Sequence, residues 1–385
     1  MCLVYDCLYP HTIGGAERWY RELASNLVQG GHDVTYLTRR QWDGPPPHIE
    51  GVRVVEVMGR ANLYADGGQR RITPAVRFGV GVFAHLLRRG RSYDIVHTCS
   101  FPFFSLLGTR LALVGATTRV GVDWFEVWSD SYWRAYLGRA GGQIGIVVQR
   151  LCVRLTPFAF VYSELSDRRL RSLGQTPPPM LLRGLHPEPT SVVEGQTTPS
   201  GPPVVLLVGR LIPEKRAHLL PAVVAAARSQ VPDLRGLVVG DGPGRAALDA
   251  SVAEAGMEKW VDAPGFVDRA RLEVALATAA CLLVTSQREG YGIVVLEAAS
   301  RGTPVVVVEA EDNAAADLIE PGLNGLRVSS DDPAAIAHAV VRVIEAGEAM
   351  RSSTLQWFAA NVESLSAATS AARVVACYEA GLASR

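Results

Sequence analysis

The sequence CLLVTSQREGYGIVVLEA, at residues 281–298, is the clearest sign of how this 385-residue chain folds. The apolar run at 281–285 predicts a buried strand, and the glycines at 290 and 292 then turn the chain into a helix predicted over 292–301. The same alternation of short β-branched runs and helical periodicity recurs along the chain, which predicts βαβ units with parallel sheets. The other predicted strands are 1–5, 33–37, 52–57, 93–98, 117–122, 158–162, 204–208, 235–239 and 304–308, and the other predicted helices are 16–29, 74–89, 143–155, 216–228, 245–255, 269–279, 333–346 and 367–381.

The predicted organisation is two doubly wound α/β domains in tandem. A chain of 385 residues exceeds one ordinary domain. Prolines crowd residues 176–203, where neither a helix nor a sheet continues through them. We therefore predict an N-terminal Rossmann-like domain at 1–185, a proline-rich linker at 186–203, a C-terminal domain at 204–365 and a final helix at 366–385. Ligands bind at the carboxyl ends of strands in such sheets, so the expected site is a cleft between the domains.

The charge of the chain argues against nucleic acid as a partner. Lys plus Arg and Asp plus Glu both number 38, so the formal net charge is zero. Residues 1–195 carry a net charge of +6 and the remainder −6. The basic first half either favours an anionic partner or a membrane surface, or reflects compositional drift.

Cysteine usage and hydropathy predict a cytoplasmic protein. The six cysteines form no CxxC pair and mostly flank apolar runs, as expected of reduced, buried thiols. The chain opens directly into a predicted strand, with no signal-type segment. No apolar run approaches the roughly 18 residues of a membrane span, so we expect a soluble protein or one that is peripheral at the inner face of the membrane.

Two pairs of charged residues suggest the chemistry. Glu289 and Glu297 flank the N-terminus of a predicted helix, which attracts anions, so two carboxylates there are costly unless hydroxyl donors share the site. Arg210 and Lys215 follow the strand at 204–208 in one loop, and paired cations suit a diphosphate. Together they predict a phosphate with sugar hydroxyls on either side, as in a nucleotide-sugar. The alternative for the two cations is a surface role in capping the loop.

Two glycine turns, two aromatic runs and two histidines are weaker candidates. The turns at 13–18 and 239–244 either bring backbone N–H groups to a ligand or are plain tight turns. The run DWFEVWSDSYW at 123–133 either binds a sugar ring or packs as an aromatic corner, and the apolar run at 101–107 either faces lipid or packs in the core. His11 and His97 are placed to edge the cleft, but neither has a metal-ligand partner at helical spacing. We predict no metal site.

In combination, these motifs resemble those of the retaining GT-B glycosyltransferases of family 4. The E-x7-E motif of that family is matched by EGYGIVVLE at 289–297, and its Gly-Arg-Leu … Glu-Lys segment by 209–215. Its Gly-Asp-Gly-Pro and late Asn-Gly-Leu motifs are matched at 240–243 and 324–326, and GGAE at 14–17 resembles its acceptor domain. The resemblance covers essentially the whole chain. It implies the α/β GT-B fold, in which two Rossmann-like domains face across a cleft and the final helix crosses back to the first domain.

The resemblance also implies roles for individual residues. It assigns Arg210 and Lys215 to the donor diphosphate, Glu289 to the transferred sugar and Glu297 to the ribose, with Arg210, Lys215 and Glu289 as the catalytic residues. The further donor-binding candidates are Gly14, Gly15, Gly209, Gly240, Phe266, Val267, Tyr291, Gly292 and Ile293. The candidates on the acceptor side are His97, Trp124, Glu126 and Trp128.

The implied reaction is a metal-independent, retaining transfer of a hexose-type sugar. The donor is a nucleoside-diphosphate sugar, the co-substrate in place of any cofactor, and residues 1–185 hold the hydroxyl acceptor. The departing phosphate takes the proton of the acceptor after front-face attack. The acceptor stays open between a glycolipid, a polyprenyl-linked glycan and a small metabolite, with cell-envelope glycan synthesis and peripheral membrane contact through the basic N-terminal domain as the expected setting.

The chain departs from the family at two places. Phe125 stands where relatives with a Trp-x-Glu-x-Trp pattern often carry a His that is thought to touch the donor sugar. Asn313-Ala314-Ala315 replaces a glycine pair. These departures keep two alternatives open, namely a GT-B-fold sugar-nucleotide epimerase and a non-catalytic sugar-nucleotide-binding subunit.

Overall fold

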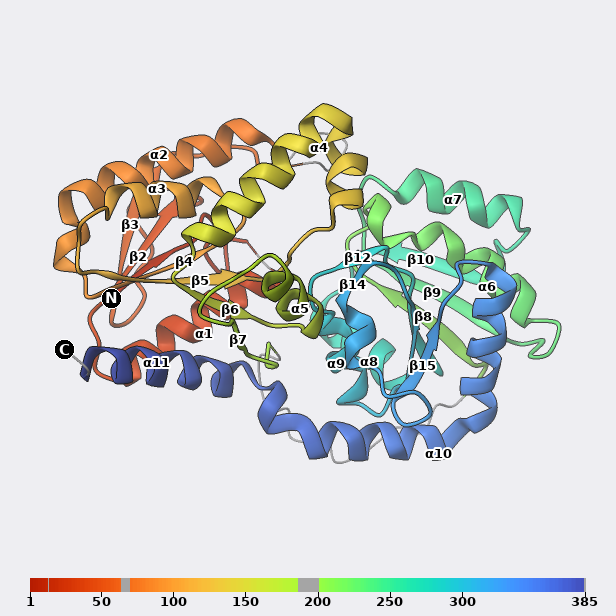
Figure 1. Ribbon diagram of the computed structural model, residues 1–385. Coiled ribbons are helices and arrows are strands. Elements are labelled where there is room, and N and C mark those ends of the chain that lie inside the picture. Colours follow the sequence, from red (N-terminus) through yellow and green to blue (C-terminus); the bar gives the residue numbers. More distant parts are fainter. Residues whose placement is uncertain (13, 64–69, 186–200, 384–385) are drawn as a thin grey trace. The chain divides into compact units, whose positions relative to one another are not determined.

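The computed structural model describes residues 1–12, 14–63, 70–185 and 201–383, and the chain forms two compact units (Figure 1). Of the described residues, the first unit comprises those up to 63, 70–185 and 363–383. The second comprises 201–362. Most of the predicted linker, residues 186–200, lies outside the described residues.

The first unit is built around a parallel sheet of seven strands in the order β3-β2-β1-β4-β5-β6-β7. The central strand β4, Ile95–Cys99, is buried at all five positions. Such burial is typical of a parallel strand covered by helices on both faces. The remaining strands are β1 (Cys2–Val4), β2 (Val34–Arg39), β3 (Val52–Met58), β5 (Arg119–Trp124), β6 (Phe158–Val161) and β7 (Met180–Leu181).

Helices cover both faces of this sheet. They are α1 (Gly15–Gln29), α2 (Ile72–Arg89), α3 (Phe104–Ala112), α4 (Asp130–Leu155), α5 (Glu164–Ser172) and α11 (Ala367–Ala383), with a 3-10 turn η1 (Gly90–Ser92) after α2. Figure 1 shows α2, α3 and α4 over one face and α1 with α11 over the other. Ser129 and Ser163 begin α4 and α5, because each side chain accepts a hydrogen bond from a backbone N–H of the first turn.

The last helix of the chain, α11, belongs to the first unit, where it lies beside α1. The Arg373 guanidinium donates to the Leu181 carbonyl at 3.1 Å, and the Gly184 N–H donates to the Ser370 hydroxyl at 3.1 Å. These bonds fix α11 against the end of β7 and the residues that follow it.

The second unit has a parallel sheet of six strands in the order β10-β9-β8-β11-β13-β15 and a small sheet of two strands, β12 and β14. The strands are β8 (Val204–Val208), β9 (Arg235–Val239), β10 (Val261–Gly265), β11 (Cys281–Val284), β12 (Arg288–Glu289), β13 (Val305–Val308), β14 (Asp312–Asn313) and β15 (Gly325–Val328). The helices are α6 (Leu220–Ala227), α7 (Arg245–Glu254), α8 (Arg269–Thr278), α9 (Ile293–Ala299) and α10 (Pro333–Leu365), with 3-10 turns η2 (Pro213–Lys215), η3 (Ala217–Leu219) and η4 (Ala314–Leu318).

The core of the second unit follows from the period-2 geometry of its strands. In β13, Val306 and Val308 join one apolar cluster while Val305 and Val307 join the cluster on the opposite face. Successive side chains of a strand point to opposite faces, so a strand of four valines fills both layers. Such continuous apolar runs predicted a doubly covered parallel sheet, and the structure confirms the α/β fold class.

Several predicted element bounds are wrong. Helix α4 begins at Asp130, well before the predicted residue 143, and continues across a kink at Gly138, which has a φ of 73°. The predicted helix at 216–228 is a 3-10 turn followed by the shorter α6. Strand β10 was not predicted, because its sequence VDAPG contains a proline; it lies at the edge of the sheet, where proline is tolerated.

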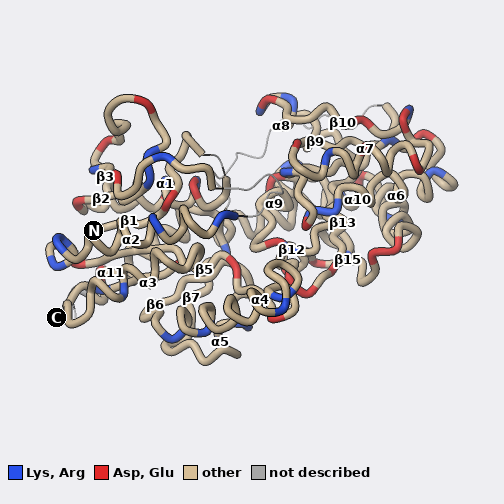
Figure 2. Tube along the Cα trace, turned by 90° about the horizontal axis from the view of Figure 1, so that it is seen from above, with Lys and Arg blue, Asp and Glu red and all other residues tan. Residues whose placement is uncertain are grey.

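Basic and acidic residues occur on both units (Figure 2). Among the described residues, no helix combines the length and the apolar character needed to cross a membrane. All six cysteines are free thiols, and every one except Cys377 is buried. This result confirms the prediction of buried, unpaired thiols.

Candidate functional site

The strongest group of predicted residues lies in the second unit, at the carboxyl ends of β8 and β11. Strands β8, β9 and β10 run toward one edge of the sheet, and β11, β13 and β15 run toward the other. The strand order therefore reverses between the neighbours β8 and β11. In open α/β sheets this is the place where the loops diverge and ligands bind.

Lys215 and Glu289 form an ion pair at this switch point. The Lys215 ammonium donates to Glu289 Oε2, and the two side chains are 21% and 19% exposed. The pair is therefore shielded from most solvent but remains reachable by a ligand. The Ser286 hydroxyl also donates to Glu289 Oε2, at 3.4 Å. The structure thus brings two of the predicted site residues into direct contact across 74 positions of sequence.

The loops that carry this pair are bonded to each other. The Gln287 N–H donates to the Glu214 carbonyl at 2.7 Å, and the Thr285 hydroxyl donates to the Lys215 carbonyl at 2.6 Å. These bonds join the end of the β8 loop to the start of the β11 loop, so the ammonium and the carboxylate are held in place by backbone.

Arg216 is a residue of this site that the sequence analysis placed in a helix instead. Among the described residues it is the one non-glycine with positive φ, at 48°. Its guanidinium donates to the Thr285 carbonyl at 2.7 Å and to Asp331 at 3.2 Å. These hydrogen bonds offset the strain of a left-handed backbone conformation, which is unfavourable for a residue with a Cβ. Burial lowers the pKa of Arg216, and Asp331 opposes that shift. Nothing in the EKR sequence at 214–216 signalled the left-handed turn.

Glycines let three neighbouring loops meet backbone to backbone. Gly240 has a φ of 135°, and a Cβ there would lie 1.9 Å from the Gly209 carbonyl oxygen. Gly209 has a φ of 151°, and its own Cβ would lie 3.6 Å from Lys215 Cε. The Gly240 N–H also donates to the Gly265 carbonyl at 2.9 Å. Immediately after Gly265, the Phe266 side chain is 76% exposed at the end of β10.

The loops that carry the predicted site residues follow the order of the strands at the carboxyl end of the sheet. Phe266 follows β10, Gly240 follows β9, Gly209 and Arg210 follow β8, and Glu289 follows β11. Because these four strands are consecutive neighbours in the sheet, their loops form a row. Val267, the next residue, is partly buried against the core and supports the chain behind Phe266.

Helix α9 carries Glu297 and is shorter than predicted. It spans Ile293–Ala299, and Gly292 precedes it with a φ of 98°. A Cβ on Gly292 would lie 2.7 Å from Ala315 Cβ, so the start of α9 packs tightly on η4. Tyr291 is buried and Glu297 is half-buried.

Asn313, which replaces the glycine pair expected from the resemblance, connects several segments of this region. Its amide donates to the carbonyls of Ser286 at 3.0 Å and Val308 at 2.9 Å, and its oxygen accepts from the Ala315 N–H at 3.1 Å. The departure from the family pattern thus connects η4 to the loop that carries Glu289.

In the first unit, His97 lies in a buried hydrogen-bond network. Asp123 is fully buried and accepts from His97 Nε2 at 2.8 Å, from Trp19 Nε1 at 2.8 Å and from the Tyr162 hydroxyl at 2.6 Å. Because a carboxylate only accepts, Nε2 carries a proton, and His97 Nδ1 forms a hydrogen bond with the Tyr378 hydroxyl at 2.6 Å. The network joins β4, β5 and β6 to α1 and α11, and His97, which is 1% exposed, faces protein on every side.

The aromatic run at 123–133 forms a packed corner, which was the alternative prediction. Trp124 is 0% and Trp128 is 7% exposed, and both belong to the apolar core of the first unit. Their indole N–H groups donate to Thr156 at 3.2 Å and to Glu126 at 2.6 Å. Phe125 stacks on Tyr162 with ring centroids 4.9 Å apart. Two buried residues of the run at 101–107, Phe103 and Leu106, pack in the same core.

The glycine turn of the first unit leads into α1. Gly14 is extended, with a φ of −167°, and Gly15 is the first residue of the helix. A Cβ on Gly14 would lie 2.4 Å from Glu17 Oε2, so the Glu17 carboxylate folds back over the turn. Burial is the main cause that raises the pKa of Glu17, which also accepts from the Tyr5 hydroxyl at 3.5 Å. Ile13, within the turn, lies outside the described residues.

No group of three or more His, Cys, Asp or Glu side chains suited to a metal ion occurs in residues 1–12, 14–63, 70–185 and 201–383.

Both halves of the sequence match known families. Residues 192–354 match the family described as glycosyl transferases group 1, and residues 13–175 match glycosyltransferase family 4. An uncharacterised glycosyltransferase of Methanocaldococcus jannaschii is 30% identical over 359 residues, covering 87% of this chain and 86% of that protein. A GDP-mannose-dependent alpha-mannosyltransferase of Mycolicibacterium smegmatis is 26% identical over 367 residues, covering 92% of each chain.

Solved structures share the fold. The sucrose-phosphate synthase of Thermosynechococcus elongatus superposes with a TM-score of 0.79 at 19% identity, covering 100% of this chain and 99% of that one. Anabaena HepE in complex with UDP superposes with a TM-score of 0.72 at 18% identity, covering 98% and 99%. At these identities the likeness concerns the fold.

Proposed function

This chain belongs to the glycosyltransferases of the GT-B fold, and on that basis we propose that it is a family 4, retaining, metal-independent hexosyltransferase. The observation that carries the proposal is the Lys215–Glu289 pair at the switch point of the second unit. A cation held against a carboxylate suits a ligand with a phosphate on one side and sugar hydroxyls on the other.

The donor diphosphate binds beside Lys215 and Arg210. Both residues leave the carboxyl end of β8 in one loop, and Arg210 is exposed. Bond breaking leaves a nucleoside diphosphate with one more negative charge, and fixed cations stabilise that charge as it develops. The Lys215 ammonium is paired with Glu289, so the diphosphate has to compete with that carboxylate for it.

We place a nucleoside-diphosphate sugar along this row of loops. Phe266, with its exposed ring, offers a stacking face to the base at one end. Gly240 and Gly209 allow close approach of backbone, and Glu289 receives the hydroxyls of the sugar at the other end. Glu297 on α9 serves the ribose. The names of the compared proteins support a nucleotide-sugar donor, since one is GDP-mannose-dependent and another was solved with UDP.

The reaction proceeds with retention at the anomeric carbon. The bond from that carbon to the phosphate oxygen breaks, and a bond to the acceptor oxygen forms on the same face. The acceptor proton passes to the departing phosphate oxygen, so no protein side chain needs to act as the base. The compared proteins are named as transferases or synthases, which favours transfer over epimerisation.

The first unit holds the acceptor and contacts the inner face of a cytoplasmic membrane. Helices α2 and α4 expose large apolar side chains, among them Ile72 and Val80 on α2 and Ile144 and Val147 on α4. Residues 72–89 contain arginines and no acidic residue. Apolar side chains beside arginines are typical of helices that lie on an anionic lipid surface, which fits a lipid-linked acceptor of cell-envelope glycan synthesis.

A donor panel tests the proposal. The purified chain is screened with UDP-, GDP-, dTDP- and ADP-sugars, and a ligand at a hundred times its dissociation constant stabilises by about 2.7 kcal/mol. We expect K215A to reduce this shift, while K259A, which removes the only other lysine, keeps it. If no nucleotide-sugar shifts the melting temperature, or if K215A behaves like K259A, the donor site is elsewhere.

Vesicle co-sedimentation tests the membrane contact separately. The double variant I144S/V147S is expected to reduce binding to phosphatidylglycerol vesicles. V274S, which alters a side chain that is 62% exposed in the second unit, is expected to leave binding unchanged. Equal binding of both variants would refute the placement of the membrane surface on α4.

A further inference from the structure

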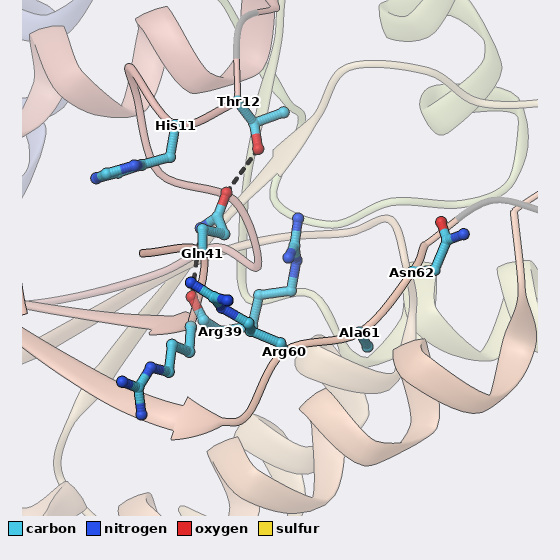
Figure 3. A pocket seen from close by; sticks show the side chains of 8 residues that line it. His11, Thr12, Arg39, Gln41, Arg60, Ala61 and Asn62 are labelled. Atoms are coloured by element: carbon cyan, nitrogen blue, oxygen red, sulfur yellow. Dashed lines mark hydrogen bonds between the residues drawn. The ribbon is translucent and has the colours of Figure 1, made fainter. Parts of the chain in front are cut away.

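An open hollow of about 470 Å³ lies in the first unit (Figure 3), and its lining includes no residue of the buried His97 network. It is lined by residues at the carboxyl ends of three neighbouring strands. His11 and Thr12 follow β1, Arg39 to Gln41 lie at and just beyond the end of β2, and Arg60 follows β3. The three strands are consecutive in the order β3-β2-β1, so one hollow collects residues far apart in sequence. Its volume falls in the range of roughly 300–1,000 Å³ typical of small-molecule sites.

The lining of this hollow is strongly basic. Three arginines and a histidine line it, and none of the lining residues is acidic. The Arg39 guanidinium donates to Cys7 Sγ at 3.8 Å, its buried Nε has no partner among the described residues, and no described carboxylate lies within 4 Å of it.

Carboxylates at the rim neutralise little of this charge. Arg60 bonds to Asp43 at 2.6 Å, but Asp43 is 96% exposed, so solvent screens this pair. The Glu56 carboxylate lies 4.0 Å from the Arg40 guanidinium, which donates its hydrogen bonds to the carbonyls of Trp42 and Gly44. The hollow therefore keeps a positive potential.

Gln41 makes the hollow a preformed site. Its side-chain oxygen accepts from the Thr12 hydroxyl at 2.6 Å and from the Leu8 N–H at 3.3 Å, and its amide donates to the Arg39 carbonyl at 3.3 Å. Figure 3 shows the bonds that join Gln41 to Thr12, in the loop after β1, and to Arg39, at the end of β2. Because the Thr12 hydroxyl donates its proton to Gln41, its oxygen remains available to accept from a hydroxyl of a ligand.

We propose that this hollow binds a phosphate group of the acceptor substrate, with Arg39 and Arg60 as its phosphate ligands and Thr12 as acceptor for a neighbouring sugar or polyol hydroxyl. Guanidinium groups hold phosphate oxygens with two parallel bonds, and several arginines suit a dianionic phosphate better than a single carboxylate. The inference rests on the proposed function, since it gives the substrate of the transferase a phosphate. The phosphate belongs to either a water-soluble phosphomonoester or a lipid headgroup.

Calorimetric titration of the full chain with inorganic phosphate tests the site. We expect saturable binding that weakens at least tenfold in R39Q/R60Q and less in R39K/R60K, which keeps the charges but loses the forked donors. The affinity should also fall with added salt. The control R77Q/R88Q removes two exposed arginines of α2 and should titrate like the wild type.

Phosphate bound in the donor site must be separated from phosphate bound here. The variant R210Q/K215Q removes the proposed diphosphate ligands, and the tenfold loss caused by R39Q/R60Q should persist in that background. Equal phosphate affinity in R39Q/R60Q and wild type, or no saturable binding, would overturn the inference. The donor panel tests nucleotide-sugar binding by the second unit, whereas the phosphate titration tests the hollow in the first. If R39Q/R60Q still binds a nucleotide-sugar but no longer binds phosphate, the phosphate site is tested independently of the proposed function.

Two further titrations identify the source of the phosphate. Binding of glucose 6-phosphate that requires Arg39 and Arg60 indicates a soluble phosphorylated acceptor. Binding only to phosphatidylglycerol vesicles, again lost in R39Q/R60Q beyond the loss in R77Q/R88Q, indicates a lipid headgroup. Either result supports the phosphate site. If R39Q/R60Q loses neither glucose 6-phosphate binding nor vesicle binding, the phosphate site is contradicted.

Discussion

Replacing Glu289 by glutamine should affect the free nucleotide and the nucleotide-sugar in opposite directions. The Glu289 carboxylate pairs with the Lys215 ammonium and neutralises its charge. E289Q keeps the shape of the side chain and releases the ammonium to a diphosphate. The carboxylate that accepts the sugar hydroxyls is lost at the same time.

The size of the gain follows from the burial of the pair. Two unit charges about 4 Å apart interact by about 4 kcal/mol at an effective dielectric constant of 20. Both side chains are about one-fifth exposed, and the incoming diphosphate replaces the carboxylate only in part, so most of this energy is not recovered. We expect E289Q to bind the nucleoside diphosphate about fivefold more tightly, a gain of about 1 kcal/mol. K215A should bind it more weakly by about 1.5–3 kcal/mol, the value of a hydrogen bond to a charged group.

The assay is calorimetric titration of wild type, E289Q and K215A with the nucleoside diphosphate that the donor panel selects, followed by kcat/KM for transfer. Loss of one preorganised interaction with the reacting group costs about 10²–10³ in rate, so E289Q should lose turnover while it gains nucleotide affinity. E258Q, a change at an exposed residue of the same unit, is the matched control. Weaker nucleotide binding by E289Q would refute the view that Glu289 masks Lys215, and unchanged turnover would remove it from the reacting site.

Three further predictions concern stability. In urea unfolding, G240A should destabilise the protein by at least about 3 kcal/mol, because a Cβ there would lie 1.9 Å from a carbonyl oxygen. The control G256A, where φ is 64° and no atom lies within 4 Å of the added Cβ, should cost only about 1 kcal/mol. Equal costs of the two variants would contradict the close packing of the loops. Y378F should cost about 1–3 kcal/mol, since it leaves the buried His97 nitrogen unpaired, and an unchanged melting temperature would argue against the network. Burial raises the pKa of Glu17 in the folded state above its usual 4.5, so the folded state binds the proton more tightly than the unfolded state. Stability should therefore fall as pH rises from about 4.5 through the raised pKa. Thermal melts of E17Q at several pH values should lack that slope, and parallel profiles for wild type and E17Q would refute the prediction.

The order of strands and helices was largely predictable, because hydrophobic period and glycine turns are local signals. Continuous runs such as Val305–Val308 indicate a strand buried on both faces, and the structure confirms them. Element bounds were less predictable. A glycine such as Gly138 is typical of a helix end, but α4 continues through a kink there. Strand β10 contains a proline, which is tolerated because β10 lies at the edge of the sheet.

The acceptor-side candidates show the limit of composition as a guide. Tryptophans beside carboxylates are equally typical of a sugar platform and of a packed corner, and burial alone distinguishes them. Trp124 and His97 are both within 1% of complete burial, because β4 and β5 lie at the centre of the sheet. Conversely, Arg39 and Arg60 drew no attention in the sequence, since 21 positions and two different strands separate them.

The sequence by itself determined the α/β class and pointed to Lys215 and Glu289, because strand period, glycine turns and charged loop residues are written locally. The tertiary structure decided which of these residues meet. The Lys215–Glu289 pair exists because β8 and β11 are neighbours in the sheet, although β9 and β10 intervene in the chain. Strand pairing over such distances depends on the packing of the whole unit, and no local pattern encodes it.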